Sequence, residues 1–509
     1  MERMTSAQDT HAQDLLDGLD ESQHTAAATV DGPVRIVAGA GAGKTRTITR
    51  RIAYACRSGQ WDPSGALAVT FSVKAANEMR SRLRGLGVDD VTAATFHSAA
   101  LQQLRRHWED ICDAPFPHIA DDGEPRRIID VALGRVCAAA GADEQTARAV
   151  QEEINWAKVS LIAPGDYPRV AAALHRRPPA GLEVQQFEDV YDCYEQEKTS
   201  HGLIDFDDIL LIACHVLDEF DDVAADIRRS VRWLTVDEYQ DVSPLQHRLM
   251  TLWLADNRNV CVVGDPAQTI YSFAGASSYD LLSFPGQFGP LAADVSLNTD
   301  YRSTPQIVGY ANRILSRSPE RGDYLRLVSA RIDGEHVRHT VYESDADEAR
   351  GVAGRIAAMV AKGEDPSDFA ILTRINVQQR LFCDALRELG LRYRVRRDTG
   401  WSGAAGDDPA SRQAVLESLG ADGAARAGAV NVSTIHASKG LEFRHVFLVG
   451  CSEGLMPYGS PADGDALEEE RRLAYVGVTR AEDSLHLSYA RAKDPAMPGR
   501  PRVPSRFLT

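Results

Sequence analysis

Short apolar runs bounded by glycine or polar residues recur along both halves of the chain and predict buried strands. In the first half these runs lie at 34–37, 66–70, 233–236 and 260–263. In the second half a further alternating set begins after Tyr301, with strands predicted at 339–342, 369–372, 393–395, 430–433, 446–449 and 485–488. Helical periodicity follows several of them, over 44–56, 75–83, 347–362 and 377–389. Strands that alternate with helices predict an α/β fold with two parallel sheets flanked by helices.

Two stretches interrupt this alternation. From about 101 to 200 the pattern is mostly helical, with apolar residues such as Ile128, Ile129, Val131, Val136 and Ala140. We interpret it as a helical domain inserted into the first half. Between 395 and 430 the chain is rich in Gly, Ala and Asp, which predicts a loop with one short helix at 411–419. The stretch 491–506, rich in Pro and Arg, is expected to be an extended tail.

Composition narrows the class of protein. Apolar residues make up 44% and charged residues 25% of the chain, which excludes a disordered chain, a collagen-like fibre and a coiled coil. No stretch approaches 18 uninterrupted apolar residues, and the first six residues do not lead into an apolar segment. We therefore expect no membrane span, no signal peptide, and a cytoplasmic, nucleoid-associated location. The eight cysteines form no C-x-x-C pair, so no zinc or redox motif is indicated.

The formal net charge is −17, from 56 basic and 73 acidic residues. Such a balance argues against a protein that coats nucleic acid with its whole surface. It does not argue against a selective nucleic-acid enzyme, because a local basic channel can lie within an acidic surface.

Gly43-Lys44-Thr45 lies between a predicted strand and a predicted helix and has the chemistry of a phosphate-binding loop. Backbone N–H groups and the helix N-terminus would cradle phosphates, Lys44 would reach the β/γ oxygens, and Thr45 would bind Mg²⁺. The generic pattern places Gly six positions before the lysine, where this chain has Ala38. The alternative is a Gly-rich turn with an exposed lysine.

A second motif has the acidic residues that phosphate chemistry needs. The apolar run 233–236 is followed by Asp237 and Glu238. Asp237 would hold Mg²⁺, and Glu238 would orient or deprotonate the attacking water. In the second half, Arg302 and Arg480 are candidates to stabilise the charge that develops on the γ-phosphoryl group. Without this context, two acids after a strand indicate a solvated turn, and the arginines indicate surface ion pairs.

These motifs resemble those of the superfamily 1 DNA helicases of the UvrD/Rep/PcrA branch, and within it the second UvrD-like type of actinobacteria. The resemblance covers about residues 19–508. It includes Leu19-Asp20-Glu21-Ser22-Gln23, the Walker A segment 38–45, Asp237-Glu238-Tyr239-Gln240-Asp241, and the segments 263–273, 297–303, 434–443 and 469–481. The family's own Walker A opens with Ala, so the departure at Ala38 disappears.

The resemblance implies the residues of an ATP site and of a DNA site. Residues implied to bind ATP are Gln23, Ala38, Gly39, Ala40, Gly41, Ala42, Gly43, Lys44, Thr45, Arg46, Tyr301 and Glu442. Catalytic roles are implied for Lys44, Glu238, Gln268, Arg302 and Arg480, and Mg²⁺ binding for Thr45 and Asp237. Contacts with single-stranded DNA are implied for Thr70, Phe71, Thr95, His97, Tyr271, Phe273, Thr434 and His436. Aromatic residues in this set suit sequence-tolerant base stacking.

The resemblance also implies two RecA-like P-loop domains with ATP in the cleft between them. The first comprises 1–104 and 204–298 with the helical insertion at 105–203. The second comprises 299–395 and 430–509 with a vestigial insertion at 396–429, where the family normally carries a large helical domain. Ala274 stands in place of the usual Arg and Asp300 in place of the usual Asn. The family's cysteine-linked tail is not expected.

The resemblance thus implies an ATP-dependent, Mg²⁺-dependent DNA helicase that moves 3′ to 5′ on single-stranded DNA. Single-stranded DNA and junctions with duplex are its expected partners, with loading or repair proteins unidentified. The shortened insertion keeps one alternative open, a translocase that strips proteins from DNA without efficient unwinding. A non-enzymatic DNA-binding module would need a broken Lys, Thr, Asp, Glu or Arg in these motifs, and all are present.

Overall fold

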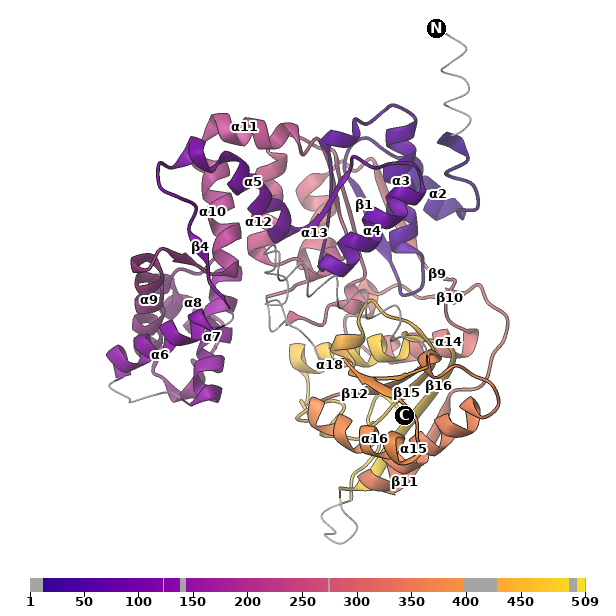
Figure 1. Ribbon diagram of the computed structural model, residues 1–509. Helices are drawn as coiled ribbons and strands as arrows, with labels where there is room; N and C mark the ends of the chain where they lie inside the picture. The colour runs from indigo at the N-terminus through magenta and orange to yellow at the C-terminus, as the bar shows by residue number, and fades with distance from the viewer. Residues whose placement is uncertain are drawn as a thin grey trace. The chain divides into compact units, whose positions relative to one another are not determined.

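Figure 1 shows the computed structural model of the chain. The structure describes residues 12–121, 123–137, 143–272, 275–396, 428–493 and 501–508. These residues form two compact units. The first contains the described residues within 1–36, 45–264 and 271–295, and the second those within 37–44, 265–270 and 296–509. The short segments 37–44 and 265–270 therefore make most of their contacts with the second half of the chain.

A six-stranded sheet has the strand order β3-β2-β6-β7-β1-β8. Its strands are β1 (Val34–Ala38), β2 (Ala66–Thr70), β3 (Thr92–Thr95), β6 (Trp233–Val236), β7 (Val260–Gly264) and β8 (Ala293–Leu297). The neighbours β3, β2, β6 and β7 pair in parallel. The four strands predicted in the first half are confirmed, whereas β3 and β8 were not predicted. The helices α3 (Lys44–Arg57), α4 (Val73–Gly85) and α5 (Phe96–Ile111) follow β1, β2 and β3.

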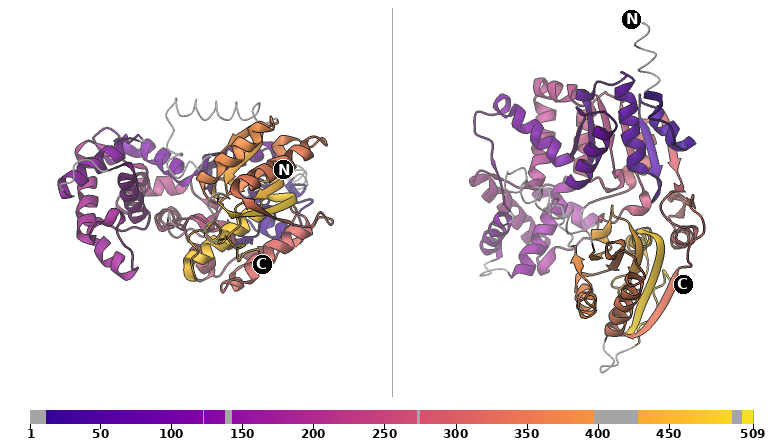
Figure 2. Two further views of the ribbon diagram at one scale, coloured as in Figure 1. Left: turned by 90° about the horizontal axis from the view of Figure 1, so that it is seen from below. Right: turned by 45° about the vertical axis from the view of Figure 1, so that its right-hand side comes forward.

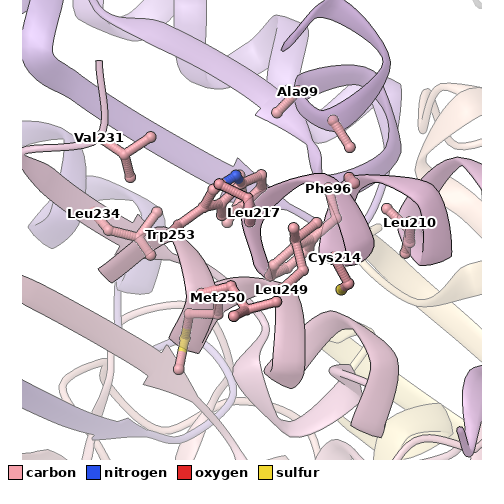
Figure 3. Packing of buried hydrophobic residues seen from close by; sticks show 14 of the residues in the cluster. Phe96, Ala99, Leu210, Cys214, Leu217, Val231, Leu234, Leu249, Met250 and Trp253 are labelled. Carbon is pink, nitrogen blue, oxygen red and sulfur yellow. The ribbon is translucent and has the colours of Figure 1, made fainter. Parts of the chain in front are cut away.

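The apolar core beside this sheet is built from residues far apart in sequence, as Figure 3 shows. The rings of Phe96 on α5 and Trp253 on α12 (Pro244–Leu254) stack with centroids 5.7 Å apart. The indole N–H of Trp253 donates to Gln103 Oε1 at 2.8 Å, which satisfies its polar atom inside the core. Leu217, on α10 (Phe206–Glu219), belongs to the same cluster. The sheet whose strand ends carry the candidate motifs is therefore supported by a well-packed apolar core.

Within the described residues, the region predicted as helical holds the end of α5 followed by α6 (Glu124–Cys137), α7 (Glu144–Val159), α8 (Tyr167–Ala173) and α9 (Val184–Ser200) (Figure 1). The helices α6 to α9 pack around their own apolar core. Ile128 and Ile129 belong to this core and Val136 packs against it, but Val131 is 43% exposed. Ala140 lies outside the described residues. The short strands β4 (His118–Ile119) and β5 (Leu203–Ile204) pair with each other where the chain enters and leaves this helical region.

A buried ionic cluster joins these helices to α10. The ammonium groups of Lys158 on α7 and Lys198 on α9 both donate to Asp205 Oδ2 at 2.6 Å, and both also contact Asp208. Each lysine side chain is at most 2% exposed. The two lysines hold the pKa of Asp205 below its usual range, whereas burial raises the pKa of the neighbouring Asp207 to about 7.

The second unit contains a six-stranded parallel sheet of order β11-β16-β15-β12-β14-β13. Its strands are β11 (Arg338–Ser344), β12 (Phe369–Thr373), β13 (Tyr393–Val395), β14 (Val430–Thr434), β15 (Phe443–Leu448) and β16 (Ala481–Ala492). All six predicted strands are confirmed, and Figure 2 shows the sheet from a second side. The helices α14 (Pro305–Ser316), α15 (Asp345–Val360), α16 (Asn376–Glu388) and α18 (Gly464–Val478) belong to this unit.

The fold class predicted from the sequence, parallel sheets flanked by helices, is confirmed. The predicted short helix at 411–419 and most of the shortened insertion lie outside the described residues. The described part of the tail, 501–508, packs on the second unit through Phe507, which is 4% exposed. Among the residues that the structure describes, no helix is both long and apolar enough to cross a membrane.

Candidate functional site

The segment 38–43 connects the end of β1 to the first residue of α3, Lys44. Gly41 has φ +70° and Gly43 has φ +79°, in the left-handed region that L side chains rarely adopt. Gly39 and Gly41 also lie against other segments: a Cβ on Gly39 would be 2.1 Å from Leu327 Cδ2, and one on Gly41 would be 2.0 Å from Asp300 Oδ1. The geometry therefore requires glycine here, as expected of a loop whose backbone approaches a phosphate closely.

Two backbone–backbone hydrogen bonds and one to a side chain hold this loop to the second half of the chain. The N–H of Gly39 donates to the carbonyl of Leu297 at 3.0 Å, and the N–H of Tyr301 donates to the carbonyl of Gly41 at 3.0 Å. The N–H of Ala40 donates to the hydroxyl of Tyr475 at 3.3 Å. Residues 38–41 thus have a fixed conformation before α3 begins.

Two residues that the sequence assigns to the nucleotide base lie near the start of the described chain. Gln23 is 1% exposed and completes a capping box on α2 (Glu21–Ala28): its Oε1 accepts from the N–H of Asp20, and its own N–H donates to Asp20 Oδ1 at 2.8 Å. Arg46 is exposed and donates to the carbonyl of Gly18 at 2.9 Å. Both side chains therefore order the segment before β1, and their contact with adenine stays a prediction.

The acidic pair follows β6 directly. Asp237 is 6% exposed, and its N–H donates to the carbonyl of Val69 on β2 at 2.8 Å, which fixes it at the carboxyl edge of the sheet. Glu238 has φ 54° and ψ 42°, a left-handed conformation that costs a non-glycine residue about 1–2 kcal/mol. Backbone strain of this kind is concentrated at functional sites.

Gln240 was not identified from the sequence as a functional residue, yet it holds the side chain of Glu238. Its Nε2 donates to Glu238 Oε2 at 2.5 Å, and the residue is fully buried. A Cβ on Gly264 would lie 2.5 Å from Gln240 Oε1, so the end of β7 must be glycine to admit this amide. The only signal for Gln240 in the sequence was its place two residues after Glu238.

The segment that follows β7 brings two predicted catalytic residues together. Asp265 is 1% exposed; its Oδ1 accepts from the N–H of Ala267 at 3.0 Å, and its Oδ2 accepts from Gln268 Nε2 at 2.7 Å. Gln268 Oε1 in turn accepts from a terminal guanidinium nitrogen of Arg480 at 3.4 Å. Gln268 and Arg480 are separated by more than 200 residues in sequence, and the fold places their side chains in contact.

Arg480 is 2% exposed and is held from several sides. Its Nε donates to the carbonyl of Val476 at 3.0 Å, and its other terminal nitrogen donates to the carbonyl of Leu441 at 3.1 Å. Arg302, the other predicted arginine, forms an ion pair with Glu442. Tyr301, the residue assigned to adenine, is 44% exposed. The structure therefore joins the two residues assigned to different parts of the nucleotide, Arg302 and Glu442, in one contact.

Asp300 is buried, at 1% exposure, beside the phosphate loop. Its Oδ1 accepts from the N–H groups of Arg302 at 2.7 Å and Ser303 at 3.0 Å. Its Oδ2 is buried without a hydrogen-bond partner among the residues that the structure describes. Burial raises the pKa of Asp300 above its usual range, despite the lowering effect of these donors and of the Arg302 charge.

We expect Asp300→Asn to stabilise the protein by about 1–3 kcal/mol at pH 8, since an amide avoids burial of a poorly satisfied charge. Because the pKa of Asp300 is raised in the folded state, the native protein keeps this proton at pH values between the unfolded and the folded pKa, where the unfolded chain has already released it. Wild-type stability therefore falls as pH rises through the folded pKa, and the advantage of the variant shrinks at pH 5. Urea unfolding of both proteins at the two pH values measures this difference. An equal loss of stability in the variant at both pH values would contradict it.

The residues assigned to DNA are distributed over both units. In the first, the rings of Phe71 and Tyr271 stack, with centroids 5.2 Å apart and an interplanar angle of 14°. Tyr271 is 9% exposed and Phe71 is half-buried. The hydroxyl of Thr70, which precedes Phe71, is buried without a hydrogen-bond partner within the described ranges. The third predicted aromatic residue, Phe273, lies outside the described residues, as does Ala274.

The two histidines of the DNA motifs are neutral at physiological pH. Burial lowers the pKa of His97 to about 3, and burial together with Arg374 and Lys439 lowers that of His436 to about 4. The His97 ring stacks on Phe206 with centroids 3.7 Å apart, a partner that sequence reasoning did not assign. Both residues can therefore contact a DNA strand through hydrogen bonds or van der Waals contacts, but not as cations.

The two threonines of these motifs have structural hydrogen bonds. Thr95 caps α5, because its Oγ1 accepts from the N–H of Ser98 at 3.1 Å. Thr434 Oγ1 accepts from the N–H of Ala437 at 3.2 Å. Each hydroxyl lies at the carboxyl end of a parallel strand, β3 or β14, the edge where ligands bind in open α/β sheets.

Comparison with known families matches both halves of the chain. The model of the UvrD/REP helicase N-terminal domain matches residues 19–289, and that of the UvrD-like helicase C-terminal domain matches 295–400 and 412–492. The chain belongs to the UvrD/REP helicase family. Its two parallel sheets are accordingly RecA-like domains, and the resemblance noted in the sequence is confirmed.

Individual relatives of this UvrD-family helicase support the same family assignment. It is 38% identical to the ATP-dependent DNA helicase UvrD2 of Mycobacterium tuberculosis, over 97% of this chain and 81% of the relative. It is 27% identical to the ATP-dependent DNA helicase PcrA of Leuconostoc citreum, over 97% of this chain and 85% of that relative. The first alignment spans 584 residues, more than the 509 of this chain, so the relative has segments without counterparts here. The chain is therefore an ATP-dependent helicase of the UvrD/PcrA type.

Proposed function

We propose that this helicase moves along single-stranded DNA in the 3′ to 5′ direction, driven by Mg²⁺-dependent ATP hydrolysis, and separates duplex DNA in repair or replication. The contact between Gln268 and Arg480 carries the proposal, because it unites the predicted phosphate sensor with the predicted arginine finger. The proposed domain boundaries are those expected from the sequence, with insertions at 105–203 and 396–429. Junctions between single-stranded and duplex DNA are the proposed substrate, with loading proteins unidentified.

Phosphate binding is assigned to the loop 38–45. Its N–H groups and the N-terminus of α3 present partial positive charge, and Lys44 adds a full charge at the γ end. The ring of Tyr301 would stack on adenine, with Gln23 and Arg46 contributing to the same end. Glu442 would face the ribose while its ion pair with Arg302 fixes both side chains.

Hydrolysis is assigned to Glu238, whose carboxylate would orient the attacking water and accept its proton. Gln240 donates to Oε2 of Glu238 and so fixes the orientation of the carboxylate, including its second oxygen, Oε1. Thr45 and Asp237 offer a hydroxyl and a carboxylate oxygen, the ligand chemistry that Mg²⁺ prefers. Bound there, Mg²⁺ would neutralise phosphate charge. Arg302, Arg480 and Gln268 would stabilise the charge that develops on the transferred group.

The strand contacts are assigned to Thr70, Phe71, Thr95, His97, Tyr271, Phe273, Thr434 and His436. Aromatic stacking and neutral polar contacts hold a strand without reading its sequence, which suits a motor that must move over any bases. Because His97 and His436 carry no charge, the salt-dependent part of DNA binding is assigned to residues outside these two, chiefly lysines and arginines.

Strand displacement on matched duplexes with either a 3′ or a 5′ single-stranded tail tests the proposal. We expect ATP-dependent displacement from the 3′ tail only, and none with Lys44→Ala. Displacement from the 5′ tail alone would contradict the proposed direction. Full ATP turnover in Lys44→Ala would contradict the assignment of the phosphate loop.

A translocase that strips proteins from DNA is the second candidate. The match to the C-terminal domain is interrupted between 400 and 412, within the region predicted as a shortened insertion. DNA-stimulated ATP turnover without displacement from either tail would favour this candidate. Removal of a streptavidin block from a biotinylated single strand would then measure translocation directly.

We expect Phe71→Ala or Tyr271→Ala to weaken single-stranded DNA binding by about 1–3 kcal/mol, the usual value of one stacked base. Because the two rings stack on each other, the double variant should lose less than the sum of the single losses. Fluorescence anisotropy with labelled oligothymidine measures these affinities. Tyr279→Ala is the matched control, because its ring is 68% exposed on the same unit and has no assigned role. Wild-type affinity in both single variants would exclude a base-stacking role for Phe71 and Tyr271.

A further inference from the structure

One face of α18 contacts both the segment 265–270 and the phosphate loop. Arg472 and Tyr475 lie three positions apart on α18, the spacing that places side chains on one face of a helix, and Thr479 is the C-cap that follows. The Nε of Arg472 donates to the carbonyl of Thr269 at 2.7 Å. Thr479 Oγ1 lies 3.3 Å from Arg480, within the same set of contacts. Tyr475 is at the centre of this face and is 1% exposed.

The hydroxyl of Tyr475 has two polar contacts, one on each side. It accepts the N–H of Ala40 in the phosphate loop at 3.3 Å, and it donates to Asp265 Oδ2 at 3.4 Å. Burial and the charge of Asp265 raise its pKa well above the usual range of a phenol, so the group stays protonated and keeps its donor. Both contacts need the oxygen atom, and a phenylalanine in this place would have neither.

Asp265 Oδ2 also links Tyr475 to Gln268. Oδ2 also accepts from Gln268 Nε2, and Gln268 Oε1 faces the guanidinium of Arg480. A continuous line of hydrogen bonds therefore runs from the backbone of Ala40 through Tyr475, Asp265 and Gln268 to Arg480. All five residues belong to the same compact unit.

We propose that Tyr475 is a positioning residue for ATP hydrolysis: its hydroxyl fixes the phosphate loop at Ala40 relative to Gln268 and Arg480 by way of Asp265. This role rests on the proposed function of the loop, of Gln268 and of Arg480. Tyr475 touches neither substrate nor metal in this assignment. It sets the distance between groups that contact the γ-phosphoryl, so its loss should slow the chemical step more than it weakens nucleotide binding.

Tyr475→Phe tests the role, because it removes one oxygen and keeps the ring. We expect kcat of DNA-stimulated ATP hydrolysis to fall about tenfold, the effect of one hydrogen bond of ordinary strength. KM for ATP and the affinity for ADP should change little. Tyr310→Phe is the matched control: Tyr310 is 4% exposed in the same unit, and its hydroxyl contacts the carbonyl of Phe507 in the tail and Arg313, neither of which has an assigned role. That variant should keep wild-type kcat.

Asp265→Asn provides the second measurement, because it replaces the shared accepting oxygen with a donor. If Tyr475 acts through Asp265, the double variant should be no slower than Asp265→Asn alone. Wild-type kcat in Tyr475→Phe, or fully additive losses in the double variant, would overturn the proposal.

Thermal unfolding separates positioning from a loss of fold. If Tyr475→Phe melts at a lower temperature than Tyr310→Phe, the positioning role is tested by Asp265→Asn instead, because that variant leaves the tyrosine in place. Wild-type kcat in that variant would then contradict the proposal. Absence of ATP turnover in the unaltered protein would contradict the proposed function instead, so the two failures are distinguishable.

Discussion

Glu238→Gln should lower kcat of DNA-stimulated ATP hydrolysis about 10²–10⁴-fold, the usual contribution of a positioned general base. The amide keeps the size of the side chain but cannot accept a proton from water. It also presents a donor or a rotated oxygen to Gln240 Nε2, so the contact that directs the carboxylate is weakened. Nucleotide binding should persist, because the phosphate loop is held by other hydrogen bonds, from Gly39, Ala40 and Tyr301.

The measurement is steady-state ATP turnover with saturating single-stranded DNA, together with ADP binding and thermal unfolding. Glu348→Gln is the matched control, since Glu348 is 3% exposed and bonds to Ser488 and Gly450, away from every assigned residue. Burial raises the pKa of Glu348, so a neutral amide imitates its protonated form. Unchanged turnover in Glu238→Gln would remove Glu238 from the mechanism.

Strands were predictable where they are buried on both faces. β2, β7 and β12 are buried at every position and are mainly apolar. β14 is equally buried but alternates Val430 and Val432 with Asn431 and Ser433. β3 was missed because Thr92-Ala93-Ala94-Thr95 has no large apolar side chain, and the pattern did not separate it from the helix that follows. β8 was missed because it lies at a sheet edge, where only Val295 and Leu297 are buried.

Residues of the site were predictable where the chemistry lies in one short segment. The phosphate loop and the pair Asp237-Glu238 follow strands directly, so the carboxyl edge of a sheet presents them together. The side chains that hold these groups were not predictable. Gln240 supports Glu238 through a left-handed turn, and Tyr475 reaches Ala40 across 435 positions of sequence. Sequence spacing gives no distance between segments of this kind, and only the fold brings them together.

The histidines show a different limit of sequence reasoning. Their motifs predicted contacts with phosphate and sugar, which does not by itself state a charge. Burial decides the charge: His97 is 5% exposed and stacks on Phe206, so its ring is neutral. The position of Phe206, at the start of α10 after the helical insertion, became relevant only when the fold placed it on that ring.

Arg480→Lys should lower kcat by about 10³-fold or more, although it keeps the positive charge, because arginine fingers contribute about 10³–10⁵-fold to phosphoryl transfer. The guanidinium of Arg480 donates to the carbonyls of Val476 and Leu441 and to the side-chain oxygens of Gln268 and Thr479. An ammonium group on a flexible stem cannot make this planar set of bonds, so its charge would not be held beside Gln268. Single-turnover ATP hydrolysis at saturating nucleotide and DNA measures the chemical step itself.

Arg471→Lys is the matched control for this experiment. Arg471 lies on α18 close to Arg480 in sequence, is 7% exposed, and forms an ion pair with Glu468 and a contact with the ring of Phe507. Its replacement removes a similar buried guanidinium and tests stability without touching Gln268. We expect a lower melting temperature with nearly unchanged kcat, whereas Arg480→Lys should show the reverse. Equal effects of the two variants on kcat would mean that α18 contributes only its packing, and Arg480 would no longer be the finger.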